Sequence, residues 1–291
     1  MILSECKILN ELAKTLGMEI ACRDICPSNP PPSIKRDGKP LGCLIAHITL
    51  SLIEAIRLER RLRPVFVHSF HSFQNLSTDP WNLVLISILL HDTGKLTKQY
   101  LELRDFQHNI WSSLVTYKVL NEPERRIASL AVLLHHEAYH WRDLEQATHY
   151  HFTFGQTMKL QKVNFDVDQL DVFIKAVIAN LTTLNLCDLT HVLSKVKEAA
   201  LALEHQDILR LIRDLKIHVL YNPKIYPQAL PIHWLLTLVD NRAASARDVY
   251  WQKVLKSVRA NNPCEFLQEI DRVVQILKPR TPKFVFLSAL Q

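Results

Sequence analysis

The stretch that decides the fold runs from Trp81 to Lys95 and reads WNLVLISILLHDTGK. Its first ten residues are apolar at almost every position, so a helix formed by them has no side suited to water. Asp79 before Pro80 is typical of a helix start, because a short polar side chain can cap the first turn and proline lacks only an amide that the helix does not need there. We therefore predict a central buried helix that presents His91 and Asp92 at its carboxyl end.

A second apolar helix is predicted to end in the same way. Asn121 and Pro123 mark its start, and the run that follows leads into His135-His136. After the first helix, Gly94 is expected to supply the helix-terminating conformation. A buried polar side chain without a partner costs several kcal/mol, so both helix ends need something to satisfy their imidazoles, and a metal ion does this well.

The rest of the chain also favours helices. Apolar residues recur at helical spacing in the segments 41–61, 170–186, 189–220, 232–260 and 265–277. The first of these segments contains His47, and segment 232–260 contains Asp240. The proline-rich residues 27–40 are expected to be a loop or linker after a short leading helix, and Pro223, Pro227 and Pro231 are expected to break the later pattern. Strand-like runs are scarce, with 283–287 a weak candidate. We predict an all-α protein with a leading helix and linker (1–40), a main domain (41–250) and a helical appendage (251–291).

Composition limits the class of protein. With 291 residues, 48% of them hydrophobic, the chain is long enough to bury a large core. Its net charge of +6 suits a phosphate-rich partner, although a solvated basic surface explains it equally. There is neither an apolar run long enough for a membrane span nor a signal-like amino terminus, so we expect a cytoplasmic protein with no membrane association. Six cysteines are spread along the chain, and Cys22 and Cys26 lack a second pair with which to bind zinc.

Imidazole nitrogen and carboxylate oxygen are ligands for first-row divalent metals such as Mn, Fe, Co, Ni and Zn. A carboxylate can also bridge two ions, and Asp92 is the natural candidate for such a bridge. Two neighbouring ions can hold a phosphodiester, generate hydroxide at neutral pH and stabilise the leaving oxygen. The pattern thus favours phosphodiester hydrolysis without a serine or cysteine nucleophile.

The order of these residues resembles the H...HD...H...HH...D signature of the two-metal HD-superfamily phosphohydrolases. The residues that carry the resemblance are His47, His91, Asp92, His108, His135, His136 and Asp240. Within the superfamily the chain is most similar to the stand-alone HD nuclease of type I CRISPR interference systems. This likeness rests on Gly38-Lys39-Pro40-Leu41 before His47, on the phrase LHDTGK, on Trp111-Ser112-Ser113 after His108 and on the segment Leu238–Ser245, and it covers roughly residues 38–250.

The resemblance implies a helical HD-domain bundle with a two-metal site at its centre. It implies that His47, His91, Asp92 and Asp240 hold one ion, and that Asp92 bridges to a second ion held by His108, His135 and His136. Lys95 matches a lysine that contacts the scissile phosphate, so the catalytic residues would be Asp92 and Lys95. The implied cofactors are two divalent ions, Mn, Co, Ni, Fe or Mg. The implied substrate is single-stranded DNA, and the implied partners are a CRISPR helicase subunit and a crRNA-guided surveillance complex.

Several alternatives stay open at this point. His68 and His71 rival His47 as the first ligand, while Asp188 and Asp248 rival Asp240. The same chemistry would serve a phosphohydrolase of nucleotides or cyclic dinucleotides, and a non-catalytic helical scaffold subunit is the alternative of another class. Two basic clusters are predicted either to contact a nucleic-acid backbone or to form solvated helix faces, one at Arg57, Arg60, Arg61 and Arg63 and one at Arg242 and Arg247.

Overall fold

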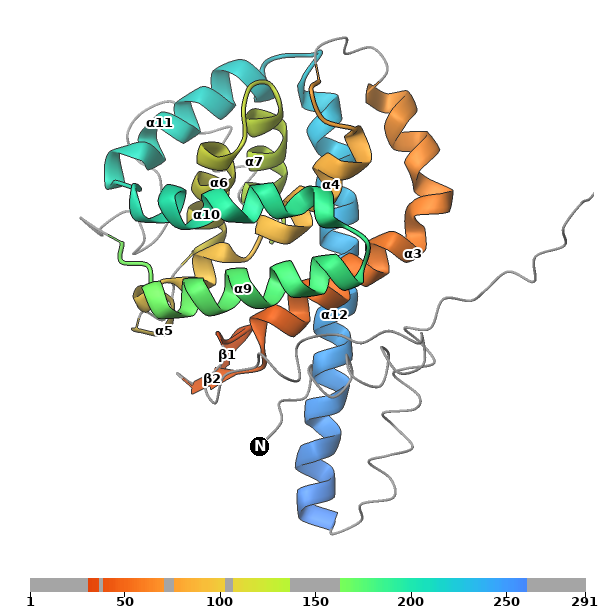
Figure 1. The fold of residues 1–291 in the computed structure, drawn as a ribbon, viewed down its shortest axis with the longest axis vertical. Helices are drawn as coiled ribbons and strands as arrows, with labels where there is room; N and C mark the ends of the chain where they lie inside the picture. The colour runs from red at the N-terminus through yellow and green to blue at the C-terminus, as the bar shows by residue number, and fades with distance from the viewer. Residues whose placement is uncertain (1–30, 37–38, 71–75, 103–106, 137–162, 261–291) are drawn as a thin grey trace, which may run out of the picture.

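The structure is a computed structural model that describes residues 31–36, 39–70, 76–102, 107–136 and 163–260. The predicted leading helix, the predicted helix 265–277 and the weak strand candidate 283–287 lie outside these residues. Within them the protein is a bundle of helices with one small hairpin, as Figure 1 shows, so the predicted all-α class is confirmed. No helix in the described part of the chain combines the length and the apolar character that crossing a membrane requires.

The elements follow one another in a simple order, with most helices between 11 and 17 residues long and two much longer. They are β1 (Ile34–Arg36), β2 (Lys39–Leu41), α3 (Leu44–Phe70), α4 (Pro80–Leu90), η1 (Thr93–Leu96), α5 (Lys98–Glu102), α6 (His108–Val119), α7 (Glu124–Leu134), α9 (Val167–Thr183), η3 (Cys187–Leu189), α10 (Thr190–Leu201), α11 (His205–Leu215), η4 (Lys216–Leu220) and α12 (Tyr226–Ala260).

Helix α4 lies at the centre of the bundle, as its apolar sequence predicts. It packs against α3, α6, α7 and α12, and nine of its eleven residues are buried. Its first turn is capped by the Asp79 carboxylate, which accepts hydrogen bonds from the amides of Trp81 (2.9 Å) and Asn82 (3.3 Å). The helix ends at Leu90, and the residues that follow it therefore emerge in the interior of the protein.

The two longest helices each run through a proline, and one of these, Pro231, was expected to break the helical pattern. Helix α3 continues past the predicted end at Arg61 and through Pro64 to Phe70, because Phe66 and Phe70 at its carboxyl end are both buried. Phe66 packs edge to face on Trp81 of α4, with ring centroids 5.5 Å apart. Helix α12 begins at Tyr226 and contains Pro231. In both helices burial of apolar side chains offsets the lost hydrogen bond of an internal proline.

Two other predictions about secondary structure need correction. In the region expected to be a loop or linker, β1 and β2 pair as antiparallel strands, and extended backbone suits Lys39, which precedes Pro40. Gly42 then turns the chain into α3 with a φ of 71°, a conformation that favours glycine. The predicted helix 189–220 is divided into η3, α10, α11 and η4, and α11 starts where Glu204 and Asp207 form a capping box.

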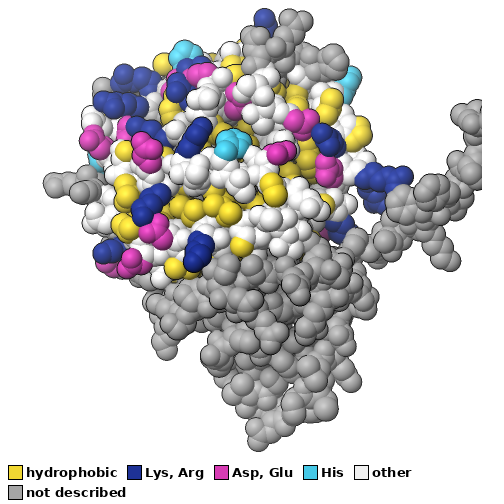
Figure 2. All heavy atoms as spheres, in the orientation of Figure 1, with side chains coloured by type: hydrophobic (Ala, Val, Ile, Leu, Met, Phe, Trp, Pro, Cys, Tyr) yellow, Lys and Arg dark blue, Asp and Glu magenta, His cyan; other side chains and the backbone are white. Residues whose placement is uncertain are grey.

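Charged side chains of both signs are interspersed on the face drawn in Figure 2. On this face Lys and Arg do not gather into one continuous patch over the described residues. The basic surplus of the chain is therefore not concentrated here.

Candidate metal centre

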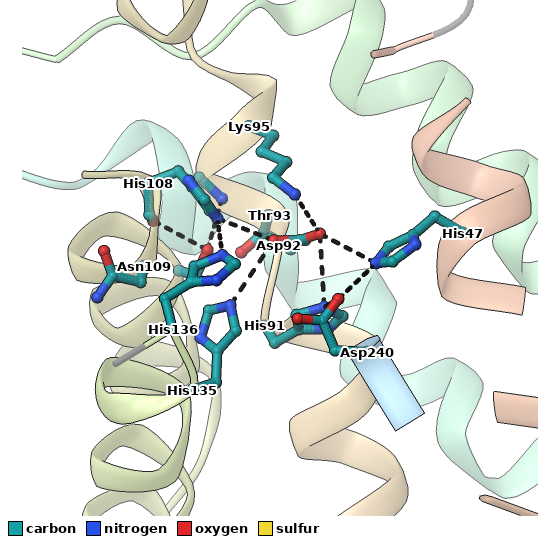
Figure 3. Close-up of polar contacts among 12 residues, drawn as sticks. His47, His91, Asp92, Thr93, Lys95, His108, Asn109, His135, His136 and Asp240 are labelled. Carbon is teal, nitrogen blue, oxygen red and sulfur yellow. Dashed lines mark hydrogen bonds and ion pairs between the residues drawn. The ribbon is translucent and has the colours of Figure 1, made fainter. Parts of the chain in front are cut away.

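The seven side chains predicted as ligands come from five elements and meet in the centre of the bundle (Figure 3). Helix α3 contributes one, the end of α4 two, the start of α6 one, the end of α7 two, and α12 one. They fall into two groups, and in each group the candidate ligand atoms lie within 4.8 Å of one another. The first ligand group is His47, His91, Asp92 and Asp240, and the second ligand group is Asp92, His108, His135 and His136.

The first ligand group is fully buried. Nε2 of His47 lies 2.9 Å from Oδ1 of Asp240 and 3.5 Å from Oδ2 of Asp92. Nε2 of His91 lies 3.4 Å from the same Asp92 oxygen and 3.7 Å from Oδ1 of Asp240. Two imidazoles and two carboxylates thus direct their donor atoms at one small volume.

The second ligand group uses the other oxygen of Asp92. Nε2 of His108 lies 3.0 Å from Oδ1 of Asp92, and Nε2 of His135 lies 3.9 Å from it. Nε2 of His136 lies 2.8 Å from Nε2 of His108. Since Oδ2 faces the first group and Oδ1 the second, Asp92 stands between the two groups in the position of a bridging ligand.

Two of the histidines are oriented by carbonyl groups of their own helices. A carbonyl oxygen can only accept, so Nδ1 of His91 donates to Ile88 (2.7 Å) and Nδ1 of His135 donates to Val132 (2.5 Å). In the neutral imidazole this leaves Nε2 as a bare lone pair, and both Nε2 atoms are buried without a hydrogen-bond partner. A nitrogen lone pair and a carboxylate oxygen that face each other repel unless a cation lies between them, so the donor atoms of these residues fit a metal ion.

The pKa shifts favour the ligand form of the second group. Burial, reinforced by the charge of neighbouring imidazoles, lowers the pKa of His135 well below its ordinary value of 6.5. Burial and the nearby His108 lower the pKa of His136 to about 3. Burial and the ammonium of Lys95 also lower the pKa of His108. These imidazoles are therefore neutral at physiological pH, which is the form that binds a metal ion.

The carboxylates remain charged despite their burial. Burial alone would raise the pKa of Asp92, but Lys95 and the surrounding histidines hold it well below its ordinary value. Burial would likewise raise the pKa of Asp240, but its hydrogen bond with His47 and the nearby imidazole of His91 outweigh this effect and lower the pKa. At His91 the two carboxylates outweigh burial and raise the pKa, which shows that they attract positive charge to this position.

Lys95 is a buried residue. Its Nζ donates to Oδ2 of Asp92 at 2.7 Å, so an ammonium group lies at the edge of the first ligand group. Burial would lower the pKa of Lys95, but the Asp92 carboxylate outweighs it and raises the pKa.

Gly94 has a different role from the one predicted. It lies inside η1 without the left-handed backbone of a helix-terminating glycine. A Cβ atom at this position would lie 2.1 Å from the backbone oxygen of His108, so only glycine permits the close approach of η1 and the start of α6. The amide of Gly94 also donates to the hydroxyl of Ser112 at 2.8 Å.

The rival ligand candidates either lie away from the two ligand groups or fall outside the residues that the structure describes. His68 and Asp188 are both exposed, and neither belongs to a ligand group. His71, Cys22, Cys26 and the side chain of Asp248 fall outside the described part of the chain. Among the described residues, His47 and Asp240 are thus the ones placed beside His91 and Asp92.

Sequence reasoning missed three polar side chains next to the ligands. Asn109 follows His108 and is buried, and His233 and Thr237 precede Asp240 on α12. The spacing of seven residues between His233 and Asp240 places both on one face of a helix. That spacing was the signal that could have found His233.

Comparisons with known proteins include a likeness to a solved structure. No protein-family model matches the chain, and no curated protein matches it. A CRISPR-associated Cas3 HD domain protein from Methanocaldococcus jannaschii is structurally similar, with a TM-score of 0.46 and 19% sequence identity. The likeness covers 68% of this chain and 95% of that one. From the geometry of the chain itself, the expectation of a helical bundle with a His/Asp cluster at its centre, able to hold metal, is confirmed.

Proposed function

We propose that this protein is a metal-dependent HD nuclease that hydrolyses phosphodiester bonds of single-stranded DNA. The observation that carries the proposal is the position of Asp92, whose two carboxylate oxygens face two separate groups of imidazole and carboxylate ligands. Two divalent ions bound there, with Mn, Co, Ni, Fe and Mg as the candidates, would supply an activated water and neutralise the charge of the phosphodiester.

The residues of the chain have distinct parts in this proposal. Lys95 keeps an ammonium beside Asp92, where it would offset negative charge that grows on a non-bridging phosphate oxygen in the transition state. His91 and His135 have side chains with no exposed surface, whereas those of His108 and Asp240 are 13% and 11% exposed. The substrate would therefore reach the site on the side of His108 and Asp240.

A contact between the two predicted basic clusters supports a strand rather than a free nucleotide as substrate. The buried Glu54 of α3 accepts hydrogen bonds from Arg57 on the same helix and from Arg242 on α12. Arg242 belongs to the turn of α12 that carries Asp240, and its side chain is 42% exposed. Two guanidinium groups on one carboxylate leave an excess positive charge, which suits a phosphate of a strand that continues beyond the metal centre.

The proposal includes partners that prepare the strand. The sequence given contains no Gly-x-x-x-x-Gly-Lys-Ser/Thr phosphate loop. The proposal assigns unwinding of duplex DNA to a helicase subunit acting with a crRNA-guided surveillance complex, as the resemblance of the sequence implies.

The test is an assay of the purified protein with Mn, Co, Ni or Mg on labelled single strands, beside a panel of nucleotides and cyclic dinucleotides. Asp92→Asn serves as the inactive variant, and Asp188→Asn, which changes an exposed aspartate, is the matched control. We expect metal-dependent cutting of strands by the wild type and by Asp188→Asn only. Phosphate release from nucleotides without strand cutting would reject the nuclease, and no metal-dependent activity on any substrate would favour the scaffold.

A further inference from the structure

Four consecutive backbone carbonyl groups at the carboxyl end of α7 accept hydrogen bonds from side chains. Nδ1 of His135 donates to Val132 (2.5 Å) and Nδ2 of Asn109 donates to Leu133 (2.7 Å). Helix α12 supplies the other two donors: Nε2 of His233 donates to Leu134 (3.0 Å), and Oγ1 of Thr237 donates to His135 (3.3 Å).

These contacts occur where a helix lacks hydrogen bonds of its own. The last four carbonyls of an α-helix have no amide partner further along the helix, and α7 ends at Leu134. Consecutive helical residues point roughly 100° apart, so His135 and His136 can both face one ion only if the backbone at the helix end is fixed in a particular conformation. The four donors act on this part of the backbone.

The residues that donate these hydrogen bonds also lie next to other candidate ligands, either in the chain or on the same face of a helix. Asn109 follows His108, which belongs to the second ligand group. His233, Thr237 and Asp240 lie at positions i, i+4 and i+7 of α12 and therefore share one face of that helix. The same face of α12 thus contacts the end of α7 through two residues and His47 of α3 through a third.

We propose that Asn109, His233 and Thr237 are positioning residues that hold the end of α7, and that they thereby direct His135 and His136 to the second ligand group. The proposal rests on the proposed function only in assigning this group to a metal ion. It predicts that loss of the hydrogen-bond donors on α12 weakens metal binding at the second ligand group and leaves metal binding at the first ligand group unchanged.

The experiment measures Co²⁺ binding by visible absorption and calorimetry in two backgrounds. In His47→Gln the first ligand group is impaired, so the remaining strong site is the second group. In His136→Gln the second group is impaired, and the remaining strong site is the first. Each background is combined with Thr237→Val, which keeps the shape of the side chain but removes its donor, and with His233→Leu. Thr237→Ser and His233→Gln restore a donor, and Thr182→Val changes an exposed threonine of α9 as the control.

We expect Thr237→Val and His233→Leu to weaken Co²⁺ binding about 10-fold to 100-fold in the His47→Gln background, the range typical for partners that orient metal ligands. In the His136→Gln background the same two substitutions should leave Co²⁺ binding unchanged. The donor-restoring variants should recover most of the affinity, and Thr182→Val should have no effect.

Equal weakening of Co²⁺ binding in both backgrounds, or none in either, would overturn the positioning role. If unaltered protein binds no Co²⁺, the metal centre itself is refuted, which is a different result. Thr237 is only partly buried, so the single variant Thr237→Val, verified as folded by circular dichroism, decides the question if the His233 variants do not fold.

Discussion

Nε2 of His47 lies 2.9 Å from Oδ1 of Asp240, although 193 residues separate the two along the chain. The contact forms because α3 and α12 both pack against the central helix α4 and against each other. It places one imidazole and one carboxylate beside His91 and Asp92 at the end of α4, so the first ligand group depends on helices near opposite ends of the described chain.

Asp92→Ala should abolish cleavage. Both ligand groups contain Asp92, so its loss should lower the metal content below two ions per chain. The cleavage rate should fall by about 10⁴-fold or more, the scale seen when an essential catalytic group is removed. Initial cleavage rates and elemental analysis test this, with circular dichroism as the check on folding because Lys95 loses its ion-pair partner. Two retained ions with wild-type cleavage would contradict the role of Asp92.

Lys95→Ala should separate catalysis from metal binding. Lys95 contacts Asp92 but belongs to neither ligand group, so the variant should keep its metal. We expect cleavage to slow by about 10² to 10³, as when other transition-state charge donors are removed. Single-turnover rates at saturating metal, together with metal content, provide the measurement. Loss of the metal from this variant would show that Lys95 serves the site in another way.

Gly94→Ala should disturb the site without removing a polar group. The added Cβ would meet the backbone oxygen of His108 at 2.1 Å, so η1 and the start of α6 must move apart. We expect a loss of about 1 to 3 kcal/mol in the free energy of unfolding, together with weaker binding at the second ligand group. Urea unfolding and metal titration test both effects, and unchanged stability would mean that the two segments separate more easily than their packing indicates.

Arg242→Gln should weaken strand binding more than catalysis on a small substrate. If Arg242 contacts one phosphate, the slope of log K against log salt concentration should fall by about 0.7, the value for one contact on a single strand. Fluorescence anisotropy with a labelled single strand at several salt concentrations gives this slope. Arg213→Gln on α11 replaces another exposed arginine and should leave the slope unchanged. Equal slopes for wild type and Arg242→Gln would remove Arg242 from the strand-binding surface.

Stability should depend on pH through a cluster that joins α6, α7 and α11. Arg126 donates to Asp214 at 2.8 and 3.0 Å, and the hydroxyl of Tyr117 donates to the same carboxylate at 2.9 Å. Burial and this hydrogen bond raise the pKa of Tyr117 from 10.0 to about 12. Because the folded pKa is the higher one, the stabilisation is complete below pH 10 and is lost as the pH rises towards 12.

The pKa of Asp214 shifts in the opposite direction. Burial would raise its pKa, but the hydrogen bonds from Arg126 and Tyr117 outweigh burial and lower it from 3.8. Its contribution is therefore present above the unfolded value and is lost as the pH falls through the folded pKa. Thermal unfolding between pH 3 and 11 should show a flatter acid limb for Asp214→Asn and a flatter alkaline limb for Tyr117→Phe. Curves parallel to that of the wild type would contradict the linkage.

The sequence predicted best where one physical effect dominates. Helix α4 was recognisable because its apolar residues cover every side and Asp79 caps it, and His91 and Asp92 followed from its end. The carboxyl end of α3 and the start of α12 could not be predicted, because tertiary burial of residues such as Phe66 outweighs the local effect of proline. The donors on the end of α7 were also hidden, since Thr237 and His135 become neighbours only after α12 packs against α7.

A crystal structure of the protein soaked in Mn²⁺, with anomalous difference maps, tests the central claim most directly. We predict two peaks about 3.5 to 4 Å apart, on opposite sides of the Asp92 carboxylate, one beside His47 and Asp240 and the other beside His108 and His136. A map without a peak at either ligand group, in crystals that show Mn²⁺ bound elsewhere, would contradict the account.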